Sequence, residues 1–140
     1  MSLYQLSVFL PNQPGQLANF FELLMNNKIY IISLTVAETE DYGLLLLLVD
    51  QFEKCVTLLE QKEILYSVTE VVAIRLSDNI GQLYKIAKIL GSNNINIEYL
   101  YTFSEHSTQA TTITVLRLDD NVKATEVLKT SGFDLVEHLK

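Results

Sequence analysis

The chain has little cysteine, few basic residues and no long apolar run. Its single cysteine, Cys55, cannot form an internal disulfide. Its start, MSLYQLSVFLPNQ, lacks the basic segment and long apolar core of a secretion signal. The most apolar stretch, Leu44–Val49, is far shorter than the roughly 20 residues that a helix needs to cross a bilayer. We therefore expect a cytoplasmic protein without a membrane span.

Positive charge is scarce. The chain carries 10 Lys and Arg against 17 Asp and Glu, a net charge of −7, and its basic residues form no cluster. Proteins that bind nucleic acids or anionic membrane surfaces need a basic patch, so both classes of partner are excluded. With 49% hydrophobic residues, 140 residues can build the core of one domain or of two small ones.

The chain contains an internal repeat. Residues 12–17 read NQPGQL, and residues 78–83, which follow 66 positions later, read DNIGQL. With this shift, residues 12–35 align with 78–101, and the apolar positions that differ mostly stay apolar. The identical pairs are Gly15/Gly81, Gln16/Gln82, Leu17/Leu83, Leu24/Leu90, Asn27/Asn93, Ile29/Ile95, Ile31/Ile97 and Leu34/Leu100. The two halves are therefore predicted to share one small fold.

Hydrophobic periodicity predicts the same six elements in each half. Alternating apolar residues indicate strands, and apolar residues at i, i+3, i+4 and i+7 indicate amphipathic helices. After the second strand the shift grows to 69, so the second hairpin is about three residues longer. In the first half we expect strands at 4–10, 29–37, 44–49 and 65–68, with helices from 17 and from 52; in the second, strands at 72–76, 95–103, 112–118 and 134–136, with helices over 83–90 and around 124–128.

The order β-α-β-β-α-β, found twice, predicts an α+β protein of two ferredoxin-like units in tandem. Each unit has an antiparallel four-stranded sheet with both helices on one face. We place the domains at 1–69 and 70–140. The run Leu44–Val49 is apolar on both faces of its strand, which predicts cover on both sides and a homodimer.

The repeated loop lies between the first strand and the first helix of each unit. Asn12 and Asp78 suit helix capping, Pro14 suits a first helical position, and Gly15 and Gly81 permit tight turns, so a turn and a cap explain the loop structurally. The same helix N-terminus can bind a small carboxylate through its N–H groups and partial positive charge. An amino acid fits such a site.

The topology, the loops NQPGQL and DNIGQL, and the segments NKIYI and NNINI together resemble the ACT domain, a regulatory module that binds amino acids. The resemblance covers essentially the whole chain as two copies. It implies a ligand between paired units, held by the loop of one and the second strand of its neighbour. The residues that it implicates are Asn12, Gln13, Gly15, Gln16, Leu17, Asp78, Asn79, Gly81, Gln82, Leu83, Asn96 and Ile97.

The sequence departs from the family pattern at three places. Asp78 replaces the loop asparagine, Tyr30 stands where the second half has Asn96, and Leu10 and Leu76 replace a family histidine. Because neither half has the full polar set, we expect one composite site built from Asn12 and Asn96 rather than two equal ones.

Other functions have less support. His106, His138 and Cys55 form no pattern typical of a nucleophile or a metal site, so we predict no enzyme, no metal and no cofactor. The acidic turn with Glu38, Glu40 and Asp41 is interpreted as a solvated loop. The stripe Tyr99, Tyr101 and Phe103 is interpreted as core or pairing surface rather than an RNA-stacking platform, because the basic surface of RNA-binding domains is missing.

Two functional hypotheses remain. In the first, the protein senses an amino acid and reports to a separate protein, an enzyme or a transcription factor. In the second, it is an assembly module without a small ligand. Stabilisation by a ligand distinguishes the two, because only a sensor gains stability from bound amino acid.

Overall fold

A computed structural model describes residues 3–38, 42–77, 81–105 and 111–139. The chain divides into two compact units, whose main parts are Tyr4–Thr69, here the N-terminal unit, and Glu70–His138, here the C-terminal unit. The elements are β1 (Leu3–Pro11), α1 (Gln16–Asn26), β2 (Ile31–Glu38), β3 (Tyr42–Val49), α2 (Phe52–Gln61), β4 (Tyr66–Ser77), α3 (Gln82–Ser92), β5 (Ile97–Ser104), β6 (Thr111–Leu118), α4 (Asn121–Thr130) and β7 (Asp134–Val136).

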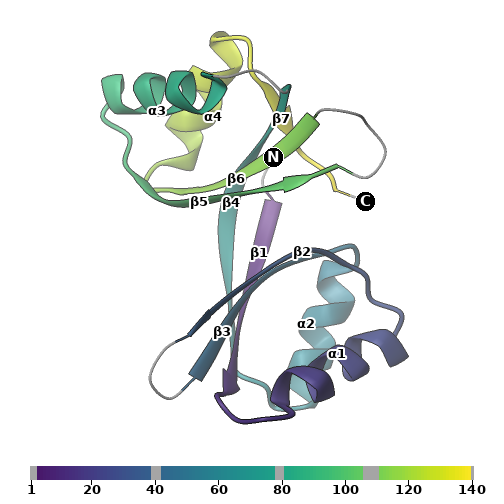
Figure 1. Ribbon diagram of the computed structural model, residues 1–140. Coiled ribbons are helices and arrows are strands. Elements are labelled where there is room, and N and C mark those ends of the chain that lie inside the picture. The colour runs from purple at the N-terminus through teal and green to yellow at the C-terminus, as the bar shows by residue number, and fades with distance from the viewer. Residues whose placement is uncertain (1–2, 39–41, 78–80, 106–110, 140) are drawn as a thin grey trace. The chain divides into compact units, whose positions relative to one another are not determined.

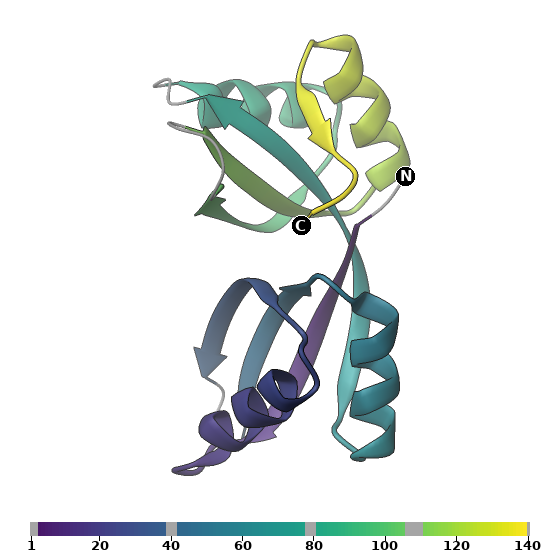
Figure 2. The ribbon, with the colours of Figure 1, turned by 90° about the vertical axis from the view of Figure 1, so that its right-hand side faces the viewer.

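Both units have the predicted architecture. In each, two helices cover one face of an antiparallel sheet (Figures 1 and 2). The strand order is β2-β3-β1-β4 in the N-terminal unit and β5-β6-β4-β7 in the C-terminal unit, which is the same order twice. The prediction of tandem ferredoxin-like units is therefore confirmed.

Each unit has its own apolar core between sheet and helices. In the N-terminal unit, Leu6, Val8 and Leu10 of β1 pack with buried residues of both helices, among them Phe20 and Leu59. In the C-terminal unit the matching residues are Val72, Ile74 and Leu76 of β4, together with Ile86 of α3 and Leu128 of α4. The alternation in these strands therefore does mark the faces that the helices cover.

The four helices that the structure describes all end in the same way. A residue with positive φ follows the helix, and the next amide donates back to a carbonyl five residues earlier, which is a Schellman motif. In α1 the two residues are Lys28 (φ 56°) and Ile29, whose N–H donates to Leu24 O at 3.0 Å. The other pairs are Glu63 with Ile64, Asn94 with Ile95, and Gly132 with Phe133. Because the amides of Ile29 and Ile95 close helices, β2 and β5 begin two residues later than predicted.

A second set of hydrogen bonds repeats across the duplication. The backbone N–H of Tyr30 donates to Asp50 Oδ1 at 2.9 Å, and that of Asn96 donates to Asp119 Oδ1 at 3.0 Å. Lys54 and Lys123 donate in the same way to the carbonyls of Asn27 and Asn93, at 2.6 and 2.7 Å. The numbers of matching residues in the two units differ by 66 before the hairpin and by 69 after it. This agrees with a second hairpin that is three residues longer.

One strand differs from the prediction. The expected strands at 65–68 and 72–76 form a single strand, β4, of 12 residues. The segment between them, Thr69–Val71, contains no glycine, proline, asparagine or aspartate that would favour a turn. The unit boundary therefore falls inside a continuous strand, between Thr69 and Glu70.

The Schellman motif of α1 generates a test of stability. A residue other than glycine with positive φ costs roughly 1–2 kcal/mol, and glycine gives back part of this through its larger loss of entropy. We therefore expect Lys28→Gly to raise the free energy of unfolding by up to about 1 kcal/mol. Urea unfolding measures the change.

Lys28→Ala is the control for this substitution, because alanine removes the side chain and keeps the backbone cost. It should give no comparable gain. A stabilisation of equal size in both variants would show that the lysine side chain, rather than the backbone, is the cause.

Candidate functional site

The first helix begins at a left-handed glycine. Gly15 is the N-cap residue, with φ 89° and ψ −13°, and as a glycine it has no side chain that could cap the first turn of α1. The first helical hydrogen bond runs from the N–H of Asn19 to Gly15 O at 3.0 Å. The prediction that Asn12 caps this helix and that Pro14 is its first residue is therefore wrong. Glycine turns the chain after both residues, since it adopts positive φ without strain.

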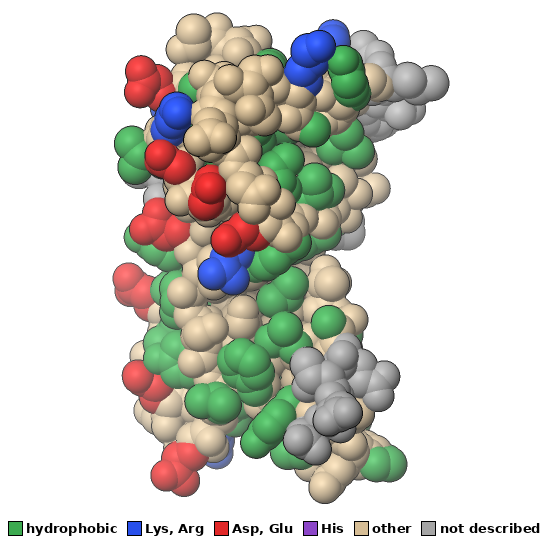
Figure 3. Space-filling model, turned by 90° about the vertical axis from the view of Figure 1, so that its left-hand side faces the viewer, with side chains coloured by type: hydrophobic (Ala, Val, Ile, Leu, Met, Phe, Trp, Pro, Cys, Tyr) green, Lys and Arg blue, Asp and Glu red, His purple; other side chains and the backbone are tan. Residues whose placement is uncertain are grey.

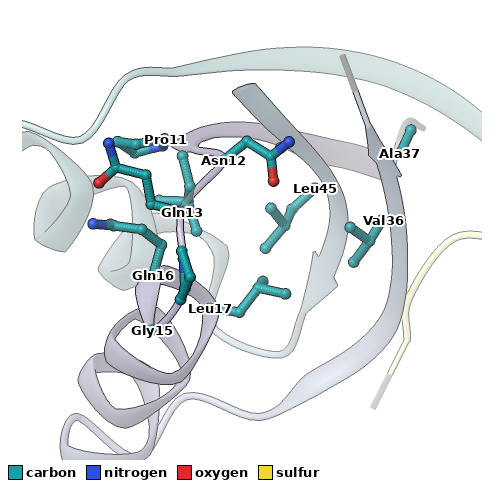
Figure 4. A pocket seen from close by; sticks show the side chains of 12 residues that line it. Pro11, Asn12, Gln13, Gly15, Gln16, Leu17, Val36, Ala37 and Leu45 are labelled. Atoms are coloured by element: carbon teal, nitrogen blue, oxygen red, sulfur yellow. The ribbon is translucent and has the colours of Figure 1, made fainter. Parts of the chain in front are cut away.

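A pocket of about 310 Å³, here the loop pocket, lies beside this helix start. Asn12, Gln13, Gly15, Gln16 and Leu17 line it, so the structure brings the predicted residues of the first loop together. Figure 4 shows that the side chains of Asn12 and Leu17 face Val36 and Leu45 across the pocket. Those of Gln13 and Gln16 extend away from this group.

The loop pocket combines an apolar wall with a polar rim. The side chain of Leu17 is 39% exposed and that of Val36 is 50% exposed, so part of the apolar surface is open to a ligand. None of the described residues that line the pocket is charged. The N-terminus of α1 carries a partial positive charge, because its first N–H groups have no carbonyl partners within the helix. A carboxylate is thus favoured at the helix start, and apolar groups are favoured deeper in.

Sequence reasoning missed the strand residues of this pocket, Val36, Ala37, Gly43 and Leu45. In the sheet, Val36 pairs with Leu45, and Leu10 pairs with Gly43. The sequence shows which residues of β1 and β3 face the helices. It does not show that Val36 lies opposite Leu45, because this register depends on the pairing between strands.

The second loop is described only from Gly81 onward; Asp78 and Asn79 lie outside the described residues. Gly81 is the N-cap of α3 with φ 99°, and Gln82 and Leu83 open the helix, as their counterparts do in α1. Asn96 is exposed, and the half-buried Ile97 begins β5. Asn12 and Asn96 belong to different units, so the composite site stays a prediction.

A second cavity, of about 490 Å³, is also found in the N-terminal unit. Gln16 and Asn19 of α1 line it, together with Lys62, Glu63 and Leu65 from the turn after α2. Gln16 lines both cavities.

The titratable groups of the described residues do not assemble a reactive centre. Among them, no three His, Cys, Asp or Glu side chains lie close enough to share a metal ion. Cys55 is fully buried in the core, and burial raises the pKa of its thiol to about 11. Its thiolate, the reactive form, is therefore scarce at neutral pH. His106, Glu40 and Asp41 lie outside the described residues.

The aromatic stripe on β5 is half-buried. Tyr99, Tyr101 and Phe103 alternate with exposed residues, and Tyr101 and Phe103 pair with the buried Val115 and Ile113. Burial raises the pKa of the Tyr101 hydroxyl. Separately, none of the described helices is long and apolar enough to cross a membrane.

Comparison with known proteins gives consistent results. The family model described as ACT domain pair matches residues 1–140. The crystal structure of protein BT0572 from Bacteroides thetaiotaomicron superposes with a TM-score of 0.90 at 32% identity, covering 97% of this chain and 92% of that one. No curated protein matches the sequence.

More distant structures share the fold. The regulatory subunit of aspartate kinase from Thermus thermophilus, in its ligand-free form, has a TM-score of 0.63 at 17% identity and covers 92% of both chains. That from Thermus flavus has a TM-score of 0.62 at 16% identity, covering 90% of this chain and 88% of its own.

The burial of Cys55 can be tested by its reactivity. With a pKa of about 11, the folded protein should react with a disulfide reagent such as dithionitrobenzoate at pH 8 only very slowly, and at the ordinary rate of a free thiol in 6 M guanidinium. Release of the coloured thiolate, followed by absorbance, measures both rates. Fast modification of the folded protein would show that Cys55 is accessible.

Proposed function

Because the chain belongs to the ACT domain pair family, whose domains are regulatory modules, we propose that it binds an amino acid in the loop pocket. The observation that carries this proposal is the start of α1 at a left-handed glycine, beside the exposed apolar surface of Leu17 and Val36. A free amino acid has the matching features, a carboxylate next to an ammonium group and a side chain.

Each part of the ligand has a matching group in the pocket. The N–H of Gln16 already donates to Gln13 O at 3.3 Å. The carboxylate accepts hydrogen bonds from the next N–H groups in the first turn of α1, which have no carbonyl partner within the helix. The carboxamide oxygen of Asn12 can accept from the ammonium group. The side chain then lies against Leu17, Val36 and Leu45, and since these are aliphatic, the loop pocket favours an aliphatic amino acid.

Regulation in this proposal is non-catalytic. A ligand shifts an equilibrium only by its different affinity for two states, so the amino acid changes which form of the protein is populated. The signal passes to a separate protein, an enzyme or a transcription factor, that binds one form better than the other.

We further propose that the protein is a homodimer. β2 is the edge strand of the N-terminal sheet and exposes Leu34 (37%) and Val36 (50%). Figure 3 shows hydrophobic side chains gathered on one face of this unit, in the lower half of the view. An exposed apolar edge strand is a favourable surface for pairing with a second copy.

Thermal unfolding with each of the twenty amino acids at 10 mM tests the ligand. We expect one or a few aliphatic amino acids to raise the melting temperature, because a ligand bound only to the folded state adds RT ln(1 + [L]/Kd) to its stability, about 2.7 kcal/mol at 100 times Kd. Asn12→Ala should remove most of this rise.

Asn19→Ala is the matched control. Asn19 is an exposed asparagine on the same helix, and it lines the second cavity rather than the loop pocket. The control should keep the response. If no amino acid raises the melting temperature, the protein is the assembly module of the alternative hypothesis.

Light scattering at micromolar concentration tests the dimer. The wild type should give twice the mass of the chain, and Val36→Lys should give monomer or a weaker dimer, because a charge on an edge strand opposes pairing. A monomeric wild type would contradict the proposal.

A further inference from the structure

A groove of about 410 Å³, here the helix groove, lies between the two helices of the C-terminal unit. α3 and α4 pack side by side on one face of the sheet (Figure 1), and residues of both helices line the groove. Its apolar part consists of Ile89, Val127 and Phe133, which are all half-buried. A partner that covered the groove would therefore remove further apolar surface from water.

The rim of the helix groove is cationic. Lys85 and Lys88 line it, and none of the described residues that line it is acidic. Neither ammonium group forms an ion pair with a carboxylate of the described residues, whereas Arg75, Arg117 and Lys129 each do. An anion can therefore approach Lys85 and Lys88 without displacing a carboxylate partner.

One of these lysines is held beside an exposed aromatic ring. The ammonium of Lys88 lies 5.8 Å from the ring centroid of Tyr84 and donates to Tyr84 Oη at 3.3 Å. The two residues are four apart in α3, so they share one side of the helix. Tyr84 is 65% exposed. Tyrosine is enriched among the residues that anchor protein interfaces, and here its ring stands next to an oriented positive charge.

The N-terminal unit has a cavity at the matching place, with different chemistry. Four residues of the helix groove correspond through the repeat to residues that line the second cavity. The pairs are Lys85/Asn19, Ile89/Leu23, Ser131/Lys62 and Phe133/Ile64. Helix α3 carries two lysines and no acidic residue, whereas α1 carries one glutamate and no basic residue. The hollow is thus a property of the shared fold, and the positive charge on its first helix is particular to the C-terminal unit.

The chemistry of the groove identifies an occupant. Its apolar part favours an aliphatic or aromatic side chain, and its unpaired ammonium groups favour carboxylates. An amphipathic helix offers both at a spacing of three or four residues, and such helices bind in hydrophobic grooves. A long polyanion such as nucleic acid would meet repulsion from a chain with net charge −7. A short acidic segment experiences mainly the local charges, because salt screens those beyond about 8 Å.

We propose that the helix groove is the docking site of the separate protein to which this chain reports, and that it binds an acidic amphipathic helix of that partner. Carboxylates of the partner pair with Lys85 and Lys88, and an apolar side chain lies against Ile89, Val127 and Phe133. The inference rests on the part of the proposed function that passes the signal to a separate protein. It does not require a ligand in the loop pocket, because an assembly module needs a partner as well.

Selection from random peptides displayed on phage tests this docking site. The full chain is the target, and the double variant Lys85→Glu with Lys88→Glu removes peptides that bind elsewhere. We expect the enriched peptides to carry Asp or Glu three or four positions from an aliphatic or aromatic residue, the spacing of one helix face. Enrichment of basic peptides, of peptides that bind target and double variant equally, or of no peptide would overturn the inference.

Fluorescence anisotropy of the most enriched peptide measures the role of each lysine. Lys85→Glu and Lys88→Glu should each weaken binding about tenfold, because repulsion replaces attraction. A second peptide, with lysine in place of its acidic residues, should bind Lys88→Glu better than the wild type. A merely structural effect of the substitution would not produce this exchange, and its absence would contradict direct pairing.

Lys28→Glu is the matched control. Lys28 is an exposed lysine of the N-terminal unit, and its substitution changes the net charge by the same amount. This variant should bind the selected peptide as the wild type does. Equal weakening in Lys28→Glu and Lys88→Glu would show that overall charge governs binding, and the helix groove would then not be the docking site.

The peptide measurements and the amino-acid response fail separately. If an amino acid raises the melting temperature and no peptide binds through Lys85 and Lys88, the docking site is wrong and the proposed ligand stands. If the peptide binds through these lysines and no amino acid has an effect, the docking site is supported and the chain is the assembly module.

Discussion

The left-handed glycine at the start of the first helix of each unit is the constraint on which the candidate sites depend. Gly15 and Gly81 are the N-cap residues at positive φ, and α1 and α3 each begin at the residue that follows. A glycine has no side chain of its own that could occupy the first N–H groups of its helix. The N–H groups without a carbonyl partner in the helix, together with its partial positive charge, therefore favour a bound carboxylate.

The duplication preserves backbone geometry and varies the surfaces around it. Asp50 and Asp119 accept hydrogen bonds at the same place, and the helices close with the same motif. These contacts hold the main chain, so a change would disturb the fold of the unit. Exposed side chains on the helices do not hold the main chain, and Asn19 and Lys85 can therefore differ.

The fold could be predicted from the sequence because its signals are local. Alternation in β1 and a period near 3.6 in α1 appear within single segments, and the repeat lets each half support the other. The capping role of Asn12 was wrong because capping preference is weaker than the need for glycine at positive φ. Val36 and Leu45 were missed because their meeting depends on strand register. The continuous β4 was missed although its signal is local, since Thr69–Val71 contains no residue that favours a turn.

The sequence by itself determined the two-fold repeat, the order of elements, the faces that form the cores and the loops beside which the candidate sites lie. Each of these follows from residue type and spacing along the chain. Only the tertiary structure decided which strand residues stand behind the first loop and that the buried hydroxyl of Thr114 has no hydrogen-bond partner among the described residues. The physical reason is that pockets and unpaired groups arise from pairing between distant segments, and register and burial are properties of the folded chain.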